Sequence, residues 1–169
     1  MPELRVPWKR KRGLVTYTPD VPKLEFVSRF TILLGDPLTL CPGPNGERRV
    51  VPILGGTFAG PKLSGSIRPG GADWQIVAPN GLVTIDTRYT LDSLAGPIFT
   101  ATTGVRVATP EVMARISLGE EVSPDEYYFR LVVKLESGID SLWWVNNSIF
   151  IAKAERGKSK VAYDLFAVL

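Results

Sequence analysis

The chain contains no histidine and a single cysteine, Cys41, among its 169 residues. Without histidine there is no Ser-His-Asp or Cys-His catalytic machinery, and no imidazole to bind a metal or to titrate near neutral pH. One cysteine excludes an internal disulfide and, in the absence of histidine, a structural zinc site. There is also no glycine-rich nucleotide-binding motif. We therefore expect no metal and no cofactor, so that acid–base chemistry depends on carboxylates, tyrosines, lysines and arginines.

Long apolar runs are also missing, since none approaches the roughly 18 residues of a membrane span. The basic N-terminus has no apolar stretch behind it that could form a signal peptide. These absences predict a cytoplasmic protein with no membrane partner. The excess of positive charge lies at the N-terminus: residues 1–12 have a balance of +4, whereas the remaining residues have −1, for a net charge of +3. We interpret residues 1–22 as a basic N-terminal arm and residues 23–169 as one domain, with no motif for nucleic-acid binding.

Signals for β-strands and turns dominate the rest of the sequence. Residues 23–34 alternate between apolar and polar side chains, which is typical of a half-buried strand. Residues 35–47 are rich in glycine and proline and are predicted to be a loop. Further strands are expected at residues 48–54, 58–68, 98–106, 127–136, 142–153 and 160–168.

One segment has the signals of a helix. Thr109 is a suitable N-cap, Pro110 fits the first helical position, and Gly119 can end the helix. We predict a helix from Pro110 to Leu118. Many short strands at regular spacing with one short helix indicate an all-β fold, and a closed barrel leaves no exposed sheet edge. The expected fold is therefore a single closed antiparallel β-barrel of lipocalin-like size with one short crossing helix.

A hairpin is predicted around Asn80-Gly81, because this dipeptide between two β-prone runs is a strong signal for a two-residue turn. In that register Asp73 lies opposite Arg88, and Gln75 lies opposite Asp86. Side chains alternate along a strand, so this polar set shares one face of the hairpin while apolar side chains share the other. The polar face either lines a cavity or forms an exposed cross-strand ion pair, and the sequence leaves both alternatives open.

Several spaced motifs occur in one order along the chain. They are Gly46-Glu47-Arg48-Arg49, Gly55-Gly56-Thr57-Phe58, Pro69-Gly70-Gly71-Ala72-Asp73-Trp74, Asp86-Thr87-Arg88-Tyr89, Tyr127-Tyr128-Phe129-Arg130 and Trp144-Val145-Asn146. Together they resemble a family of small bacterial and fungal β-barrels catalogued as a domain of unknown function. The resemblance runs from about Leu24 to the C-terminus. Leu142-Trp143 stands where a less bulky pair is expected, and the basic arm is additional.

The resemblance implies a candidate activity, because fungal members are associated with intramolecular hydroalkoxylation. In this reaction a phenol hydroxyl adds across a prenyl alkene to close a cyclic ether, without a redox cofactor or metal. The reaction needs proton transfer, stabilisation of charge and a cavity that positions the prenyl chain. The implied partner is a small aromatic or phenolic ligand. The candidate catalytic residues are Asp73, Arg88, Asp86 and Glu136, and the candidate substrate-binding residues are Glu25, Trp74, Tyr89, Tyr128, Arg130, Trp144 and Asn146.

Two other function classes stay open. The same barrel can serve as a non-catalytic carrier, in which polar groups orient a ligand without reacting. Alternatively, a barrel filled with its own side chains acts as a structural or interaction module. In that case the tryptophans are core or interface anchors, and the polar row containing Tyr128, Arg130 and Glu136 is a solvated strand face. The sequence leaves open whether the protein forms a homo-oligomer.

Overall fold

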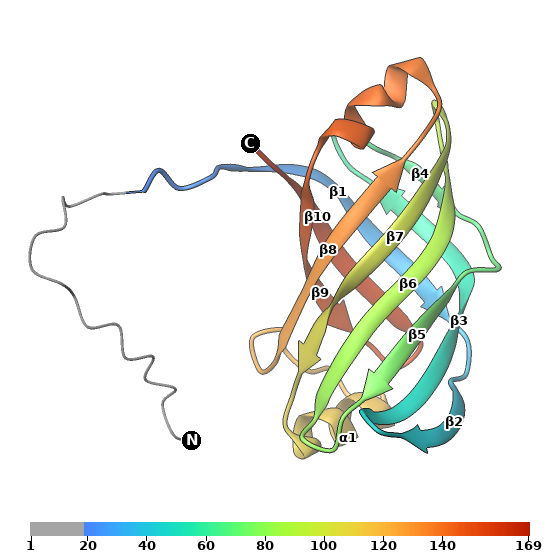
Figure 1. Ribbon diagram of the computed structural model, residues 1–169, viewed down its shortest axis with the longest axis vertical. Coiled ribbons are helices and arrows are strands. Elements are labelled where there is room, and N and C mark those ends of the chain that lie inside the picture. Colours follow the sequence, from blue (N-terminus) through green and yellow to red (C-terminus); the bar gives the residue numbers. More distant parts are fainter. Residues whose placement is uncertain (1–18) are drawn as a thin grey trace, which may run out of the picture.

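The computed structural model describes residues 19–169, which form a closed antiparallel β-barrel (Figure 1). β1 pairs with both β10 and β3 and thereby closes the ring. β4 and β5 together fill the position between β3 and β6, so the ring has eight strand positions, and β2 pairs with β3 alone. The elements are β1 (Leu24–Leu34), β2 (Leu38–Gly43), β3 (Gly46–Ala59), β4 (Gly65–Ile67), β5 (Ala72–Val77), β6 (Leu82–Ser93), β7 (Gly96–Val107), α1 (Pro110–Leu118), β8 (Tyr128–Glu136), the 3-10 helix η1 (Asp140–Asn147), β9 (Phe150–Arg156) and β10 (Lys160–Val168).

The predicted closed barrel with one short α-helix is confirmed. Residues 1–18 of the predicted basic arm, including Lys9–Arg12, lie outside the described residues. Within the described part, no helix is both long and apolar enough to span a membrane.

The helix α1 has the predicted bounds because its end signals are local. The Thr109 side chain accepts a hydrogen bond from the Val112 amide at 3.3 Å and so satisfies one of the free N–H groups of the first turn. Gly119 ends the helix in the left-handed conformation, with φ of 88°. The buried residues Val112 and Ile116 turn toward the barrel, and the helix covers one end of it (Figure 1).

Two predicted elements are wrong. The predicted loop at residues 35–47 contains strand β2, and the predicted strand at residues 142–153 begins as helix η1 before β9. Leu142 and Val145 are the buried residues of η1, and their spacing of three matches one turn of a 3-10 helix. The run Leu142 to Val145 is continuously apolar, so periodicity cannot distinguish a strand from a buried helical turn.

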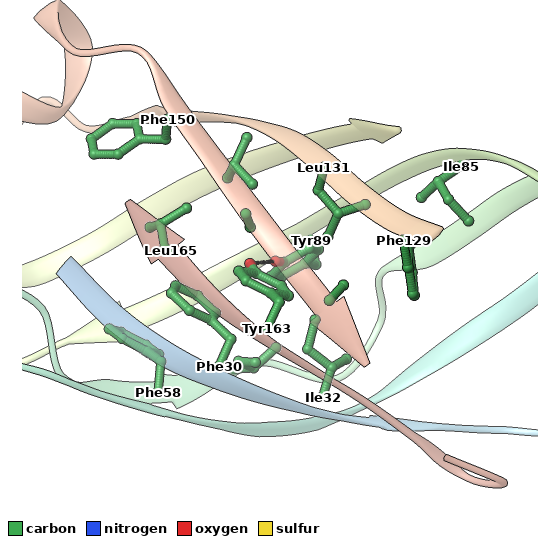
Figure 2. Packing of buried hydrophobic residues seen from close by; sticks show 14 of the residues in the cluster. Phe30, Ile32, Phe58, Ile85, Tyr89, Phe129, Leu131, Phe150, Tyr163 and Leu165 are labelled. Atoms are coloured by element: carbon green, nitrogen blue, oxygen red, sulfur yellow. Dashed lines mark hydrogen bonds between the residues drawn. The ribbon is translucent and has the colours of Figure 1, made fainter. Parts of the chain in front are cut away.

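The core fills the barrel with aromatic and aliphatic side chains (Figure 2). Phe30 stacks between Phe58 and Tyr163, with ring centroids 5.0 and 4.6 Å away. The hydroxyl oxygens of Tyr89 and Tyr163 lie 2.5 Å apart and satisfy each other inside this apolar region. These contacts show that the centre of the barrel is packed with the protein's own side chains.

The predicted register of the β5–β6 hairpin is wrong by one residue. Asp73 pairs with Thr87, and Arg88 pairs with Ala72. A two-residue turn at Asn80-Gly81 would need an N–H from Pro79 for its closing hydrogen bond, and proline has none. The Ala78 amide makes that bond instead, to the Leu82 carbonyl at 2.8 Å.

The observed turn has three residues, and Gly81 adopts the left-handed conformation with φ of 84°. Within residues 19–169, only glycines have a positive φ. A shift of one residue exchanges the two faces of a strand. Consequently Asp73 and Gln75 point into the barrel with Thr87, whereas Asp86 and Arg88 lie on the outer face.

Candidate functional site

The end of the barrel near α1 contains the only buried aspartate and the only buried arginine of residues 19–169, and no buried glutamate or lysine occurs in that range. They are Asp73 on β5, which is 8% exposed, and Arg106 on β7, which is 3% exposed. Ionisable groups are rarely buried without a partner or a function, because removing them from water is unfavourable. This pair therefore marks the candidate site.

Asp73 is held by polar groups of its own hairpin. Its two carboxylate oxygens accept hydrogen bonds from the Gln75 side-chain amide at 2.6 Å and from the Asp86 backbone amide at 3.1 Å. Burial raises the pKa of Asp73, and these hydrogen bonds, together with the nearby Arg106, oppose the rise. Desolvation is the largest of these effects, so the carboxyl group retains its proton to higher pH than an exposed aspartate does.

Arg106 has donors that the protein does not satisfy. Its Nε and Nη1 atoms are buried and have no hydrogen-bond partner among the described residues. Burial lowers its pKa to about 10, with a further lowering from Arg156 and Arg49 and an opposing effect from Asp73. The guanidinium group still carries its charge at neutral pH. Its central carbon lies 5.6 Å from the centre of the Phe129 ring, which supports one face of the group.

Two further arginines approach Arg106 from other strands. Arg49 on β3 pairs with Gln75 across the strands, and its Nε atom is also buried without a partner among residues 19–169. Arg156 lies at the end of β9, and burial is the main cause that lowers its pKa. We call Arg49, Arg106 and Arg156 the arginine cluster. Its mutual repulsion is balanced only in part by Asp73.

A cavity of about 480 Å³ lies against this cluster, within the usual range for small-molecule sites. We call it the α1-end cavity. It is bounded on the barrel wall by the arginine cluster and Gln75, and on the helix by Met113, Ile116 and Ser117. Asp73 does not line the cavity itself, but it accepts a hydrogen bond from Gln75, which does. The cavity thus has the side chains of α1, mostly apolar, on one side and a strongly cationic wall on the other.

The buried carboxyl of Asp73 predicts a specific pH dependence of stability. Its pKa is raised in the folded protein, so the folded state binds more protons than the unfolded state above about pH 4, where an unfolded aspartate ionises. The free energy of unfolding of the wild type should therefore fall relative to Asp73→Asn as pH rises from about 4 through the folded-state pKa. Denaturant titrations at a series of pH values measure this difference. Equal pH profiles for both proteins would contradict it, and Asp86→Asn, an outer-face variant, should follow the wild type.

Asp73 and Arg88, predicted to lie opposite each other as catalytic residues, are on different faces of the sheet. Arg88 forms an ion pair with Asp86 on the outer face, and both side chains are about half exposed. Trp74, next to Asp73, also points outward and is 42% exposed. The shifted hairpin register is the cause, because it leaves Asp73 alone among these residues inside the barrel.

The predicted residues of β8 also lie outside the barrel. Tyr128 and Arg130 line an outer groove of about 510 Å³ together with Val132 and Phe166. The guanidinium carbon of Arg130 lies 4.9 Å from the centre of the Tyr128 ring. Glu136 is exposed further along the strand. The polar row of this strand therefore faces away from the α1-end cavity.

The remaining predicted residues are distant from this cavity or engaged elsewhere. Glu25 forms an ion pair with Lys62 at 2.6 Å on the surface. Asn146 in η1 binds the backbone of Ser137 through both ends of its amide, at 3.0 and 2.8 Å.

Two predicted aromatic residues pack within the protein. Trp144 packs edge-on against Phe150, with ring centroids 5.8 Å apart. Tyr89 points inward as a substrate-binding residue would, but its hydroxyl group is bonded to Tyr163 in the core (Figure 2). Burial raises the pKa of Tyr89 to about 12.

Sequence reasoning missed the arginine cluster, and it placed Gln75 on the polar face of the hairpin without giving it a role. Arg49 and Arg156 lie near strand ends, and Arg106 follows Val105 in a strand that reads as threonine-rich. One signal was present: Arg106 occupies an inward position by alternation with Thr100 and Thr102, which are buried on the same strand. No group of three or more His, Cys, Asp or Glu side chains suited to a metal gathers within residues 19–169.

Comparison with known proteins identifies the family to which the chain belongs. Residues 22–168 match the family described as protein of unknown function DUF3237. A UPF0311 protein of Rhodopseudomonas palustris strain TIE-1 is 33% identical over 151 residues, which cover 88% of this chain and 99% of the relative.

Solved structures agree with this assignment. A β-barrel-like protein from Acinetobacter baumannii is 35% identical, with a TM-score of 0.78 over 91% of this chain and 100% of that chain. A protein from Penicillium herquei described as an enzyme has the same fold, with a TM-score of 0.66 and 15% identity over 92% of this chain and 100% of that chain. The chain belongs to the DUF3237 family of β-barrel proteins.

Proposed function

We propose that this protein is a cofactor-independent enzyme that closes a cyclic ether by intramolecular hydroalkoxylation of a prenylated phenol in the α1-end cavity. The observation that carries the proposal is the joint burial of Asp73 and Arg106 beside a cavity of about 480 Å³. The fold shared with the Penicillium herquei enzyme is compatible with this function.

The chemistry requires no oxidant and no net loss of atoms. The phenol O–H bond breaks and its proton passes to solvent, a new C–O bond forms at one alkene carbon as the C=C π bond breaks, and a proton from solvent is added to the other carbon. A phenol bound beside Arg106 is acidified, because the cation stabilises the phenolate form. The apolar surface of Met113 and Ile116 suits the prenyl chain.

Asp73 has a positioning role in this proposal. Its carboxylate accepts from the Gln75 amide nitrogen, which leaves the Gln75 carbonyl oxygen free to accept a hydrogen bond from the phenol. It is also the nearest buried countercharge to Arg106. Replacing Asp73 should therefore alter both the orientation of Gln75 and the charge of the site.

A second candidate function is a non-catalytic ligand carrier. It is favoured by one observation: Asp73 stands behind Gln75 and does not itself line the cavity. A carrier needs polar groups that orient a ligand and none that transfers a proton.

Turnover in D₂O distinguishes the two functions. The probe is ortho-prenylphenol, and an enzyme should convert it to an isomeric chroman with one carbon-bound deuterium, detected by mass spectrometry and NMR. Asp73→Asn should reduce turnover by about a hundredfold, because it removes the buried countercharge of Arg106 and the carboxylate that orients Gln75. Asp86→Asn, from the outer face of the same hairpin, is the matched control and should retain turnover. Full turnover by Asp73→Asn would contradict the proposal, and binding of the probe without conversion would favour the carrier.

A further inference from the structure

The arginine cluster has more positive charge than the protein neutralises. Three guanidinium groups face the α1-end cavity, and the carboxylates near them are Asp73 and Glu47. Glu47 lies 3.4 Å from Arg49, on the exposed side. At the rim, Lys158 and Asp36 offset each other in charge. Among the described residues, the cavity wall therefore has more positive than negative charge.

Two of the arginines that line the cavity, Arg106 and Arg49, also have unpaired donors. Nε and Nη1 of Arg106 and Nε of Arg49 are buried and have no partner among residues 19–169. Cationic groups with buried, unpaired donors are poorly solvated, and an anionic group in the adjacent cavity is the ligand that stabilises their charge best. Arg156, in contrast, already donates through Nη1 to the carbonyls of Gly157 and Lys160 at 2.5 and 3.0 Å.

We propose that the ligand of this cavity carries a carboxylate, which binds Arg106 and Arg49 while its apolar body lies against α1. The inference rests on the proposed function in using the same cavity, and it adds that the substrate is an acid as well as a phenol. An anionic ligand reduces the excess of positive charge on the cavity wall. The planar guanidinium fork also matches the two oxygens of a carboxylate.

Binding of two small probes tests the inference without turnover. Para-hydroxybenzoate and para-hydroxybenzamide have the same shape and differ in charge. NMR titration of the full chain should show the acid binding at least about tenfold more tightly than the amide, as expected for a charge-assisted contact. The affinity for the acid should fall as salt is added. Equal affinity for both probes, or binding of neither, would overturn the proposal, as would inorganic phosphate displacing the acid at equal concentration.

Variants locate the contact. Arg106→Met should weaken binding of the acid by at least about tenfold and leave the amide little changed, while Arg106→Lys should restore part of the loss because it keeps the charge. Arg88→Met, on the outer face, is the control and should bind as the wild type does. If Arg106→Met fails to fold, Arg49→Met, whose side chain is only partly buried, gives the same test. Unchanged acid binding in the folded variants would refute the site.

The outcomes separate this inference from the proposed function. If the protein converts ortho-prenylphenol but binds para-hydroxybenzoate no more tightly than para-hydroxybenzamide, the proposed function is supported and the proposed carboxylate on the ligand is rejected. Selective binding of the acid, with no conversion of a prenylated hydroxybenzoate, would support the anion site and reject the cyclase.

Discussion

Alanine at Gly56 should destabilise the barrel by at least about 3 kcal/mol, or prevent folding, because two unfavourable effects act together. Gly56 has φ of +145°, in the region that side chains with a Cβ rarely adopt. A Cβ at this position would also lie 2.1 Å from the Thr31 carbonyl oxygen on β1. The clash is with backbone, so no side-chain rotation can relieve it. Urea or thermal unfolding of Gly56→Ala measures the loss.

The neighbouring residue Gly55 provides a matched control. It also has positive φ, at +128°, but its nearest backbone atom would be 3.3 Å from a new Cβ. Gly55→Ala should therefore show the conformational strain without the severe clash and lose about 1–3 kcal/mol. If both variants lose the same amount, the close approach of β1 and β3 is not the cause.

Alanine at Phe30 should lower the free energy of unfolding by about 3–5 kcal/mol, the range for a large aromatic side chain removed from a core. Phe30 is fully buried and stacks on both Phe58 and Tyr163 (Figure 2). Neither stacking partner can move into the vacated space without losing its own contacts, so a cavity remains.

The control for this change is Phe99, which lies on the outer face of β7 and is 42% exposed. Phe99→Ala removes the same atoms from a solvent-exposed surface and should lower the free energy of unfolding by less than about 1 kcal/mol. Chemical denaturation of both variants gives the comparison. A loss below about 1.5 kcal/mol for Phe30→Ala would contradict a tightly packed interior.

The features that could be predicted are those with local causes. The helix α1 begins and ends where predicted because Thr109, Pro110 and Gly119 act within one turn of the chain. The barrel was predictable from the alternation of strand residues and from the turn residues between them. These signals do not depend on any distant contact.

The site was less predictable because it depends on register and on convergence. Pro79 cannot donate a hydrogen bond, and this single property lengthened the turn and moved Arg88 to the outer face. Arg49, Arg106 and Arg156 come from three strands that are far apart in sequence, and barrel closure brings them together. Of the predicted catalytic residues, only Asp73 lies near the arginine cluster.

The pairing of β1 with β10 has a consequence for biosynthesis. Arg29 and Asp164, which form an ion pair across these two strands, are separated by 135 positions in sequence. During translation, one edge of β1 therefore stays unpaired until β10 has emerged from the ribosome. Contacts of such long range slow folding, since the loop must be closed before the pairing stabilises it. Nascent chains stalled before β10 should be the form most dependent on chaperones, and a free β10 peptide is a natural competitor for that open edge.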